Sequence, residues 1–237
     1  MIKLGSNNIG KIYLGSNSIG KAYLGSNLVY QKGGGLPYTP VSYIETDGVA
    51  YIDTGIVGAD AKSCEIKCVL VNTGDIMLGC STGSEDNYNF VLLHASLSST
   101  AGFAHYYYYA AGLPSIADSL SNETPFIAKT SLAQGSQSIS VKQEGESSYT
   151  TATKTQSTAI NTGRTMFLFG ANGGGTHCSL GSKVYYCKIY NDATFTNLVR
   201  DFVPCLYQGE YGMWDRVSNS FFGNAASSGA FSGPSNS

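Results

Sequence analysis

One ten-residue phrase occurs three times at the start of this chain, as KLGSNNIGKI, YLGSNSIGKA and YLGSNLVYQK. Leu-Gly-Ser-Asn begins at residues 4, 14 and 24, and the third copy leads into three consecutive glycines at 33–35. So short a segment cannot enclose its own apolar side chains, because repeats become stable by covering one another. Each period fits a strand and a Gly-Ser-Asn turn, which predicts a small β-meander that is stable only when it docks or oligomerises.

Residues 1–32 are therefore predicted to be an attachment or assembly element, joined by a glycine linker at 33–35 to the rest of the chain. We expect the apolar side chains that recur at the repeat spacing to be buried against a neighbouring subunit or another protein. These side chains are Ile9, Leu14, Ile19 and Leu24.

Charge and hydropathy exclude several classes of partner. Residues 1–35 contain four lysines and no acid, so the remainder holds 10 of the 14 basic and all 16 acidic residues, a net charge of −6. A body of that charge is not expected to bind nucleic acid. The chain contains no secretion signal and no apolar run of about 20 residues, so membrane insertion is not expected either.

Beyond residue 36 the sequence predicts an all-β fold. Apolar and polar residues alternate in short runs bounded by Gly, Asn, Asp and Ser, whereas helical periodicity is nearly absent. Many short strands without intervening helices predict an antiparallel β-sandwich or barrel over 36–233. A tail is predicted at 234–237, and the Ser/Gly/Asn-rich composition after 223 is typical of a fading C-terminal tail. The predicted strands are 41–46, 50–53, 62–70, 75–80, 88–94, 101–109, 125–131, 137–143, 147–152, 165–170, 183–190, 197–203 and 211–214.

The cysteines show no metal-ligand spacing. Cys64 and Cys68 share a strand face with Ile66 and Leu70, and Cys187 shares one with Tyr185 and Ile189. We therefore expect small buried hydrophobic residues with free thiols, the alternatives being disulfides or metal ligands.

Two phrases bracket the body of the chain. At 42–55 the sequence reads SYIETDGVAYIDTG, in which the Asp47-Gly48 turn signal predicts a β-hairpin between the strands on either side. Residues 183–224 read KVYYCKIYNDATFTNLVRDFVPCLYQGEYGMWDRVSNSFFGN. The single tryptophan, Trp214, lies beside a turn, where it is predicted to seal one end of the sandwich; the alternative is a sugar-binding ring.

These two phrases resemble those of laminin-G-like, concanavalin-A-like jelly-roll domains in phage and prophage proteins of gut bacteria. Such domains start with a phrase like YIESTGTQYIDTG and end with one like KIYDNGTLVRDFVP, and the leader resembles phage-type YLGS segments. The middle of the chain, 81–180, matches only as alternating strands.

The resemblance implies a virion structural or appendage protein, a head or tail fibre or a decoration, that displays a lectin-like domain for adhesion to host-surface or environmental glycans. It also implies other virion proteins as partners of residues 1–32 and a homotrimer, since fibre-like phage appendages often have threefold symmetry. The alternative is a bacterial surface adhesin or a carbohydrate-binding module without a virion role.

Catalysis is not expected. Laminarinase-type jelly rolls place three carboxylates on one strand face as Glu-x-Asp-x-x-Glu. Here Glu45-Thr46-Asp47 supplies two carboxylates, but Ala50 stands at the third position. The histidines, at 94, 105 and 177, are scattered along the chain.

No cofactor is expected either. Laminin-G-like domains often bind calcium through loop oxygens, so Asp75, or Glu85 with Asp86 beside Asn87, is the candidate ligand set; the alternative is that these acids are solvated.

A tyrosine-rich run at 103–110, FAHYYYYA, is the predicted glycan-binding strand. If it is extended, Tyr106 and Tyr108 lie on one face between Ala104 and Ala110 and form an open aromatic shelf for the apolar side of a sugar ring. Asn87 is assigned to the same site. The alternative is an ordinary tyrosine-rich strand that fills both faces of the sandwich.

Overall fold

The structure of the protein is a computed structural model, which describes residues 36–72, 75–81, 124–131, 136–153, 155, 163–173 and 178–234. For 3–4, 7–8, 13–14, 17–18, 21–24, 27–31, 88–95, 103–106, 132–133 and 154 it describes the backbone alone. The described residues contain no α-helix, so the all-β prediction is confirmed.

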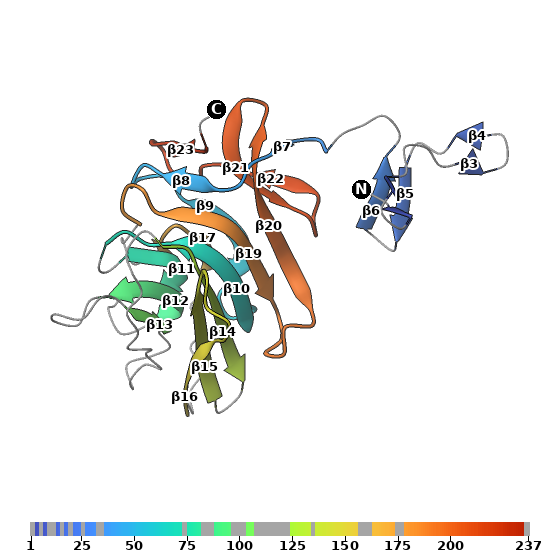
Figure 1. The fold of residues 1–237 in the computed structure, drawn as a ribbon. Helices are drawn as coiled ribbons and strands as arrows, with labels where there is room; N and C mark the ends of the chain where they lie inside the picture. The colour runs from blue at the N-terminus through green and yellow to red at the C-terminus, as the bar shows by residue number, and fades with distance from the viewer. Residues whose placement is uncertain are drawn as a thin grey trace.

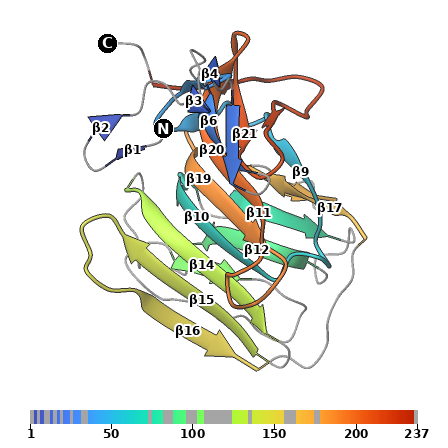
Figure 2. The same ribbon diagram turned by 90° about the vertical axis from the view of Figure 1, so that its right-hand side faces the viewer.

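Two packed sheets form the body of the protein (Figures 1 and 2). The larger has 11 strands, along a path β16-β15-β14-β10-β19-β20-β21-β22, with β7, β8 and β23 attached beside it. Its strands are β7 (Thr39–Pro40), β8 (Ile44–Thr46), β10 (Ser63–Val69), β14 (Phe126–Ala133), β15 (Ser136–Gln143), β16 (Thr150–Lys154), β19 (Lys183–Tyr190), β20 (Leu198–Tyr207), β21 (Glu210–Asp215), β22 (Ser220–Phe222) and β23 (Phe231–Ser232).

The smaller sheet has six strands, in the order β13-β12-β11-β17-β9 with β18 beside β11. Its strands are β9 (Ile52–Val57), β11 (Asp75–Ser81), β12 (Tyr88–Ala95), β13 (Phe103–Tyr106), β17 (Thr165–Leu168) and β18 (Ala171–Asn172). The pairings in both sheets are antiparallel except the short one between β11 and β18.

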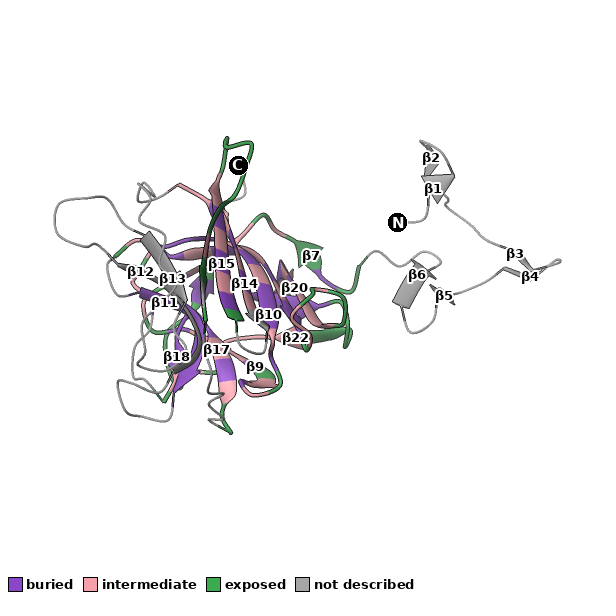
Figure 3. Cartoon of the chain, turned by 90° about the horizontal axis from the view of Figure 1, so that it is seen from below, coloured by how far each residue is buried: buried purple, intermediate pink, exposed green. Residues whose placement is uncertain are grey.

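The core lies between the two sheets, as the burial colouring of Figure 3 shows. Strand β10 illustrates how alternation in the sequence determines which side chains enter the core. Cys64, Ile66 and Cys68 are buried, whereas Glu65 and Lys67 between them are half-buried on the outer side. A register shift opposite Lys67 and Cys68 reverses this alternation in β19, so Tyr185 faces outward while Cys187 stays in the core.

All six cysteines are buried and free, as predicted. Burial raises the pKa of the Cys64 and Cys205 thiols to about 12, which removes the reactive thiolate at neutral pH. We therefore expect iodoacetamide at pH 8 to leave the native protein almost unmodified and to alkylate six thiols after denaturation without reductant. Mass spectrometry distinguishes this from a native disulfide, which would leave two thiols unmodified.

The leader forms three separate two-stranded hairpins, not the predicted meander. In the first, β1 (Lys3–Leu4) pairs with β2 (Asn7–Asn8), and the loop between them is Gly5-Ser6. The same loop recurs between β3 (Tyr13–Leu14) and β4 (Asn17–Ser18), and between β5 (Lys21–Leu24) and β6 (Asn27–Gln31). In the described strands, each repeat thus pairs within itself and not with its neighbour.

The hairpin predicted at Asp47-Gly48 is wrong. Strand β8 pairs with β19 and β23 in the large sheet, whereas β9 pairs with β17 in the small one, so the turn crosses between the sheets. Asp47 holds this crossover because its carboxylate accepts hydrogen bonds from the backbone N–H groups of Val49, Ala50 and Ala230. Burial raises the pKa of Asp47, but these three donors outweigh it and lower the pKa below its usual value.

The residues after 223 are part of the sandwich, contrary to the expectation of a fading tail. Asn224 donates to the carbonyl groups of Ser228 and Gly229 and accepts from the N–H of Tyr51. Phe231 then pairs with Thr46 in β8 and is only 7% exposed. We call residues 224–232 the C-terminal strap, because they close the end of the sandwich over the crossover turn.

Candidate functional site

Lysines and tyrosines cover the outer side of the large sheet, which faces the viewer in Figure 2. Five lysine ammonium groups lie 5.0 to 5.4 Å from the centroids of four tyrosine rings, within the range of a cation–π contact. We call this surface the lysine–tyrosine face. Its members are Tyr43, Glu45, Glu65, Lys67, Lys129, Lys142, Glu144, Tyr149, Lys183, Tyr185, Tyr186 and Lys188.

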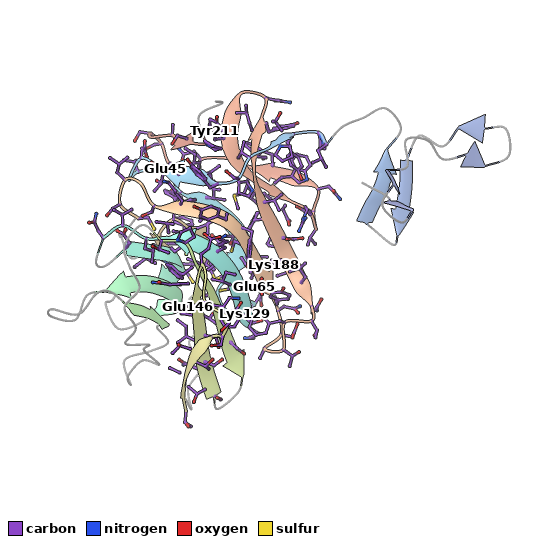
Figure 4. The ribbon with its side chains drawn as sticks, viewed as in Figure 1. Glu45, Glu65, Lys129, Glu146, Lys188 and Tyr211 are labelled. Carbon is purple, nitrogen blue, oxygen red and sulfur yellow. The ribbon has the colours of Figure 1, made fainter. Side chains whose placement is uncertain are left out.

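A row of charges crosses the middle of this face. Strand register sets Lys188, Glu65 and Lys129 side by side on β19, β10 and β14, as Figure 4 shows. Glu65 accepts from Lys129 at 2.9 Å, lies 3.6 Å from Lys188, and also accepts from the Tyr186 hydroxyl. Burial raises the pKa of Glu65. The opposite effect of Lys129, Tyr186 and Lys188 is larger in total and holds the pKa below its usual value, so the carboxylate is ionised and fully paired.

A groove of about 190 Å³ opens beside this row, at the turn between β15 and β16. Lys67 and Glu144 lie across it and pair at 2.8 Å, although 77 positions separate them in the chain. Glu146 accepts a hydrogen bond from the backbone N–H of Gln143 at 2.8 Å. The residues that line the groove are Lys67, Pro125, Ile127, Lys142, Gln143, Glu144, Gly145 and Glu146.

The connection between β19 and β20 bounds the lysine–tyrosine face at its other end. Ser63 donates to the carbonyl of Asp192 and Ser131 to that of Ala193, both at 2.7 Å, so the loop is held against the sheet. The Asp192 carboxylate accepts from Thr194, Thr196 and Asn197 within the loop. These hydrogen bonds lower the pKa of Asp192, and the one from the Thr194 side chain has the largest effect.

The described part of the predicted glycan-binding strand, residues 103–106, belongs to the other sheet. Tyr106 is the last residue of β13, where its backbone pairs with Leu92 of β12, but its side chain is outside the described part of the structure. Tyr108 and Asn87 lie outside the described residues altogether. The aromatic shelf therefore stays a prediction.

The predicted attachment residues stay predictions for the same reason. Leu14 ends β3 and Leu24 ends β5, each directly before a Gly-Ser loop, and only their backbones are described. Ile9 and Ile19 lie outside the described residues.

Asp75, proposed as a calcium ligand or a solvated loop acid, has a structural role instead. It is buried at the start of β11, where its carboxylate accepts from the N–H groups of Val71 and Asn72 and from Ser179 and Ser182. Within the described ranges, no three His, Cys, Asp or Glu side chains are placed to hold a metal ion. Glu85 and Asp86, like Asn87, are outside those ranges.

The Glu45–Asp47 pair does not form a catalytic arrangement. Glu45 pairs with Lys183 on the lysine–tyrosine face at 3.4 Å, whereas Asp47 is committed to the crossover turn. Both carboxylates thus have structural partners, and neither is placed as a free nucleophile or acid.

Trp214 packs as predicted for a residue that seals the sandwich. Its ring stacks on Tyr38 with 4.9 Å between centroids, and it is 8% exposed. Tyr38 precedes β7, which pairs with β20, so this contact fixes the point where the leader joins the body. The ring is therefore covered and unavailable to a ligand.

A second hollow, of about 390 Å³, lies between the start of β21 and the C-terminal strap, near Tyr211 in Figure 4. Its lining includes Glu210, Tyr211, Asn224 and Phe231. Glu210 accepts from the N–H of Asn224, and the Asn224 side chain is itself bonded to the strap and to Tyr51. Its polar groups hold the strap in place, so we assign no ligand to it.

The strand topology, two packed antiparallel sheets around one core, defines a concanavalin-A-like jelly-roll sandwich, which is a lectin-like fold. No protein-family model matches the chain, and no curated protein gives a significant match. Within the described part of the chain, no helix is long and apolar enough to cross a membrane.

Several solved structures are similar to the chain at low identity. A native heptameric SAP-like pentraxin from Limulus polyphemus shares 12% identity over 68% of this chain and 74% of its own, with a TM-score of 0.42. Tailspike protein 2 of Escherichia coli O157:H7 bacteriophage CAB120 shares 12% over 73% of this chain and 30% of its own, with a TM-score of 0.45. Scytalido-glutamic peptidase shares 11% over 79% of this chain and 97% of its own, with a TM-score of 0.41.

Sequence reasoning missed the groove. Its walls come from β10 and from the turn between β15 and β16, which are far apart in the chain and meet only because β14 pairs with both β10 and β15. The alternation of Glu65 and Lys67 with buried residues in β10 was a visible sign that this face is polar and exposed.

Proposed function

We propose that this protein is a non-catalytic adhesion module of a phage particle, mounted by its leader and displaying the sandwich toward glycans. The observation that carries the proposal is the division of the chain into two parts of opposite character. The sandwich encloses its own core, whereas the described strands of the leader form three hairpins in three separate sheets.

The leader supports an attachment role because isolated two-stranded hairpins are marginally stable in water. Three of them in series need a partner surface to become stable, and their repeat spacing suits a partner that is itself repetitive, such as a neighbouring subunit. We propose other virion proteins or two further copies of this chain as that partner, and the virion as its location.

The sandwich supports an adhesion role through its exposed polar and aromatic surface. The lysine–tyrosine face holds hydroxyl, ammonium and carboxylate groups on a rigid sheet, which suits the hydroxyl-rich surface of a glycan. The carboxylates at 45, 47 and 65 already have structural partners, which favours binding over hydrolysis.

The second candidate is a bacterial surface adhesin or carbohydrate-binding module without a virion role. It would use the same sandwich, so binding alone does not separate the two candidates. Immunogold labelling and mass spectrometry of purified particles do, because only the virion protein is a stoichiometric particle component.

The tyrosine shelf gives a direct test of adhesion. Replacing Tyr106 and Tyr108 together by Ala is expected to weaken glycan binding by about 1–3 kcal/mol, since stacking area is lost. The thermal unfolding midpoint should change little if both rings face solvent. A glycan array measures binding, with Tyr207→Ala as a control at a tyrosine packed against Trp214. An array that is blank for the unmodified protein would reject adhesion, and unchanged binding in the double variant would reject this shelf.

A further inference from the structure

The groove at the edge of the lysine–tyrosine face contains two charged groups without a charged partner among the described residues. Lys67 and Glu144 neutralise each other at 2.8 Å. Among the described residues, Lys142 has no carboxylate partner and contacts only the Tyr149 ring, at 5.2 Å. Glu146 has no ammonium partner there and accepts only from the backbone N–H of Gln143. One strong donor and one strong acceptor therefore remain available in the same small space.

The charge of the groove argues against an ionic ligand. Two lysines and two glutamates line it, so their charges cancel and the groove attracts neither anions nor cations over a distance. A neutral ligand with adjacent hydroxyl groups satisfies both free groups, because a hydroxyl can accept from an ammonium and donate to a carboxylate.

The apolar lining and the size of the groove restrict the class of ligand further. Pro125 and Ile127 supply an apolar surface below the charged groups, which suits the C–H face of a pyranose ring. The volume of about 190 Å³ is below the range of roughly 300–1,000 Å³ that holds drug-sized ligands. It therefore suits one sugar ring, with the rest of a glycan extending over the neighbouring face.

We propose that this groove is a binding site for a single neutral pyranose unit, held between Lys142 and Glu146 over Ile127. The site is distinct from Tyr106, which ends β13 on the other sheet. The inference rests on the proposed adhesion function and specifies the class of sugar that the protein recognises.

The test uses the full-length protein and isothermal titration with defined sugars. The neutral probes are the methyl glycosides of glucose, galactose, mannose and N-acetylglucosamine, and the charged probes are glucuronic acid and glucosamine. We expect at least one neutral probe to bind with a dissociation constant of order 1 mM, as one ring with few hydrogen bonds allows. We expect this constant to be unchanged between low and high salt, since no net charge is neutralised.

Substitution then locates the site. Lys142→Met and Glu146→Gln should each weaken the binding by about tenfold, because each removes a hydrogen bond to a charged group. The matched controls are Lys62→Met and Asp60→Asn, which alter a lysine and a carboxylate outside the lysine–tyrosine face. Both controls should leave the affinity unchanged, and circular dichroism should show that all four variants are folded.

Three results would overturn this inference. The first is that glucuronic acid or glucosamine binds more tightly than every neutral probe. The second is that both groove variants keep full affinity, and the third is that the control variants lose as much affinity as the groove variants. If the groove variants bind normally while the Tyr106/Tyr108 variant does not, the proposed adhesion function stands and this site alone is rejected. If the unmodified protein binds no sugar in titration or on the array, both are rejected.

Discussion

A chain that begins at Leu36 is expected to fold as a soluble monomer and to be absent from assembled particles. The sandwich keeps its whole core in this variant, because β7 still pairs with β20 and Tyr38 still stacks on Trp214. The variant loses the three LGSN hairpins and, with them, the apolar side chains at the repeat spacing. We expect an essentially complete loss of incorporation, measured by immunoblotting of purified particles made with the truncated gene.

A companion variant keeps the full length of the leader and changes only its apolar residues. A full-length chain with Ile9, Leu14, Ile19 and Leu24 replaced by Ser should fold normally and be excluded from particles as the truncated chain is, because burial of these four side chains drives docking. Light scattering of the unmodified protein reports whether the leader also assembles it, with a trimer expected. Normal incorporation of either variant would contradict the attachment role.

The strands were predictable because their signal is local. In β15 and in the middle of β10, buried residues alternate with residues that face outward, which is the period-2 pattern that a half-buried strand imposes on its sequence. The buried cysteines followed from the same pattern, since Cys64 and Cys68 occupy inward positions beside Ile66.

The choice of strand partners was not predictable from local pattern. Asp47-Gly48 has the sequence of a hairpin turn, yet the strands on either side pair in different sheets. The deciding contacts come from β19, β23 and β17, which lie more than 100 residues away in the chain. The groove is hidden in sequence for the same reason, because Lys67 meets Glu144 only through the pairing of β10, β14 and β15.

Composition misled the interpretation of the C-terminus. Residues 224–234 are rich in Ser, Gly, Asn and Ala, which is typical of a mobile tail. The segment is instead held by backbone and side-chain hydrogen bonds to the crossover turn, including Ala225 to Tyr51 and Ala230 to Asp47. Small residues are required here: Gly229 has a φ of +79°, and a Cβ on it would lie 2.8 Å from the Asp47 carboxylate.

Replacing Phe231 by Ala is expected to lower the free energy of unfolding by about 3–5 kcal/mol, as for other buried phenylalanines. Phe231 is the large apolar side chain of the strap that reaches the core, where its ring centroid lies 5.1 Å from that of the fully buried Phe169. Removing it leaves a cavity beside Phe169 and takes away the apolar contact that secures β23 on β8. Urea denaturation followed by tryptophan fluorescence measures the change.

Two companion variants separate this packing role from a general effect of altering the C-terminus. Phe231→Leu should cost clearly less than Phe231→Ala, because most of the cavity remains filled. A chain that ends at Pro234 should unfold like the unmodified protein, since the strap keeps all the hydrogen bonds described above. If Phe231→Ala changed the free energy of unfolding by less than about 0.5 kcal/mol, the value typical of surface substitutions, the strap would be a tail after all. The sandwich would then have to close over the Asp47 crossover without it, which the burial of Phe169 and the bonds from Asn224 and Ala230 argue against.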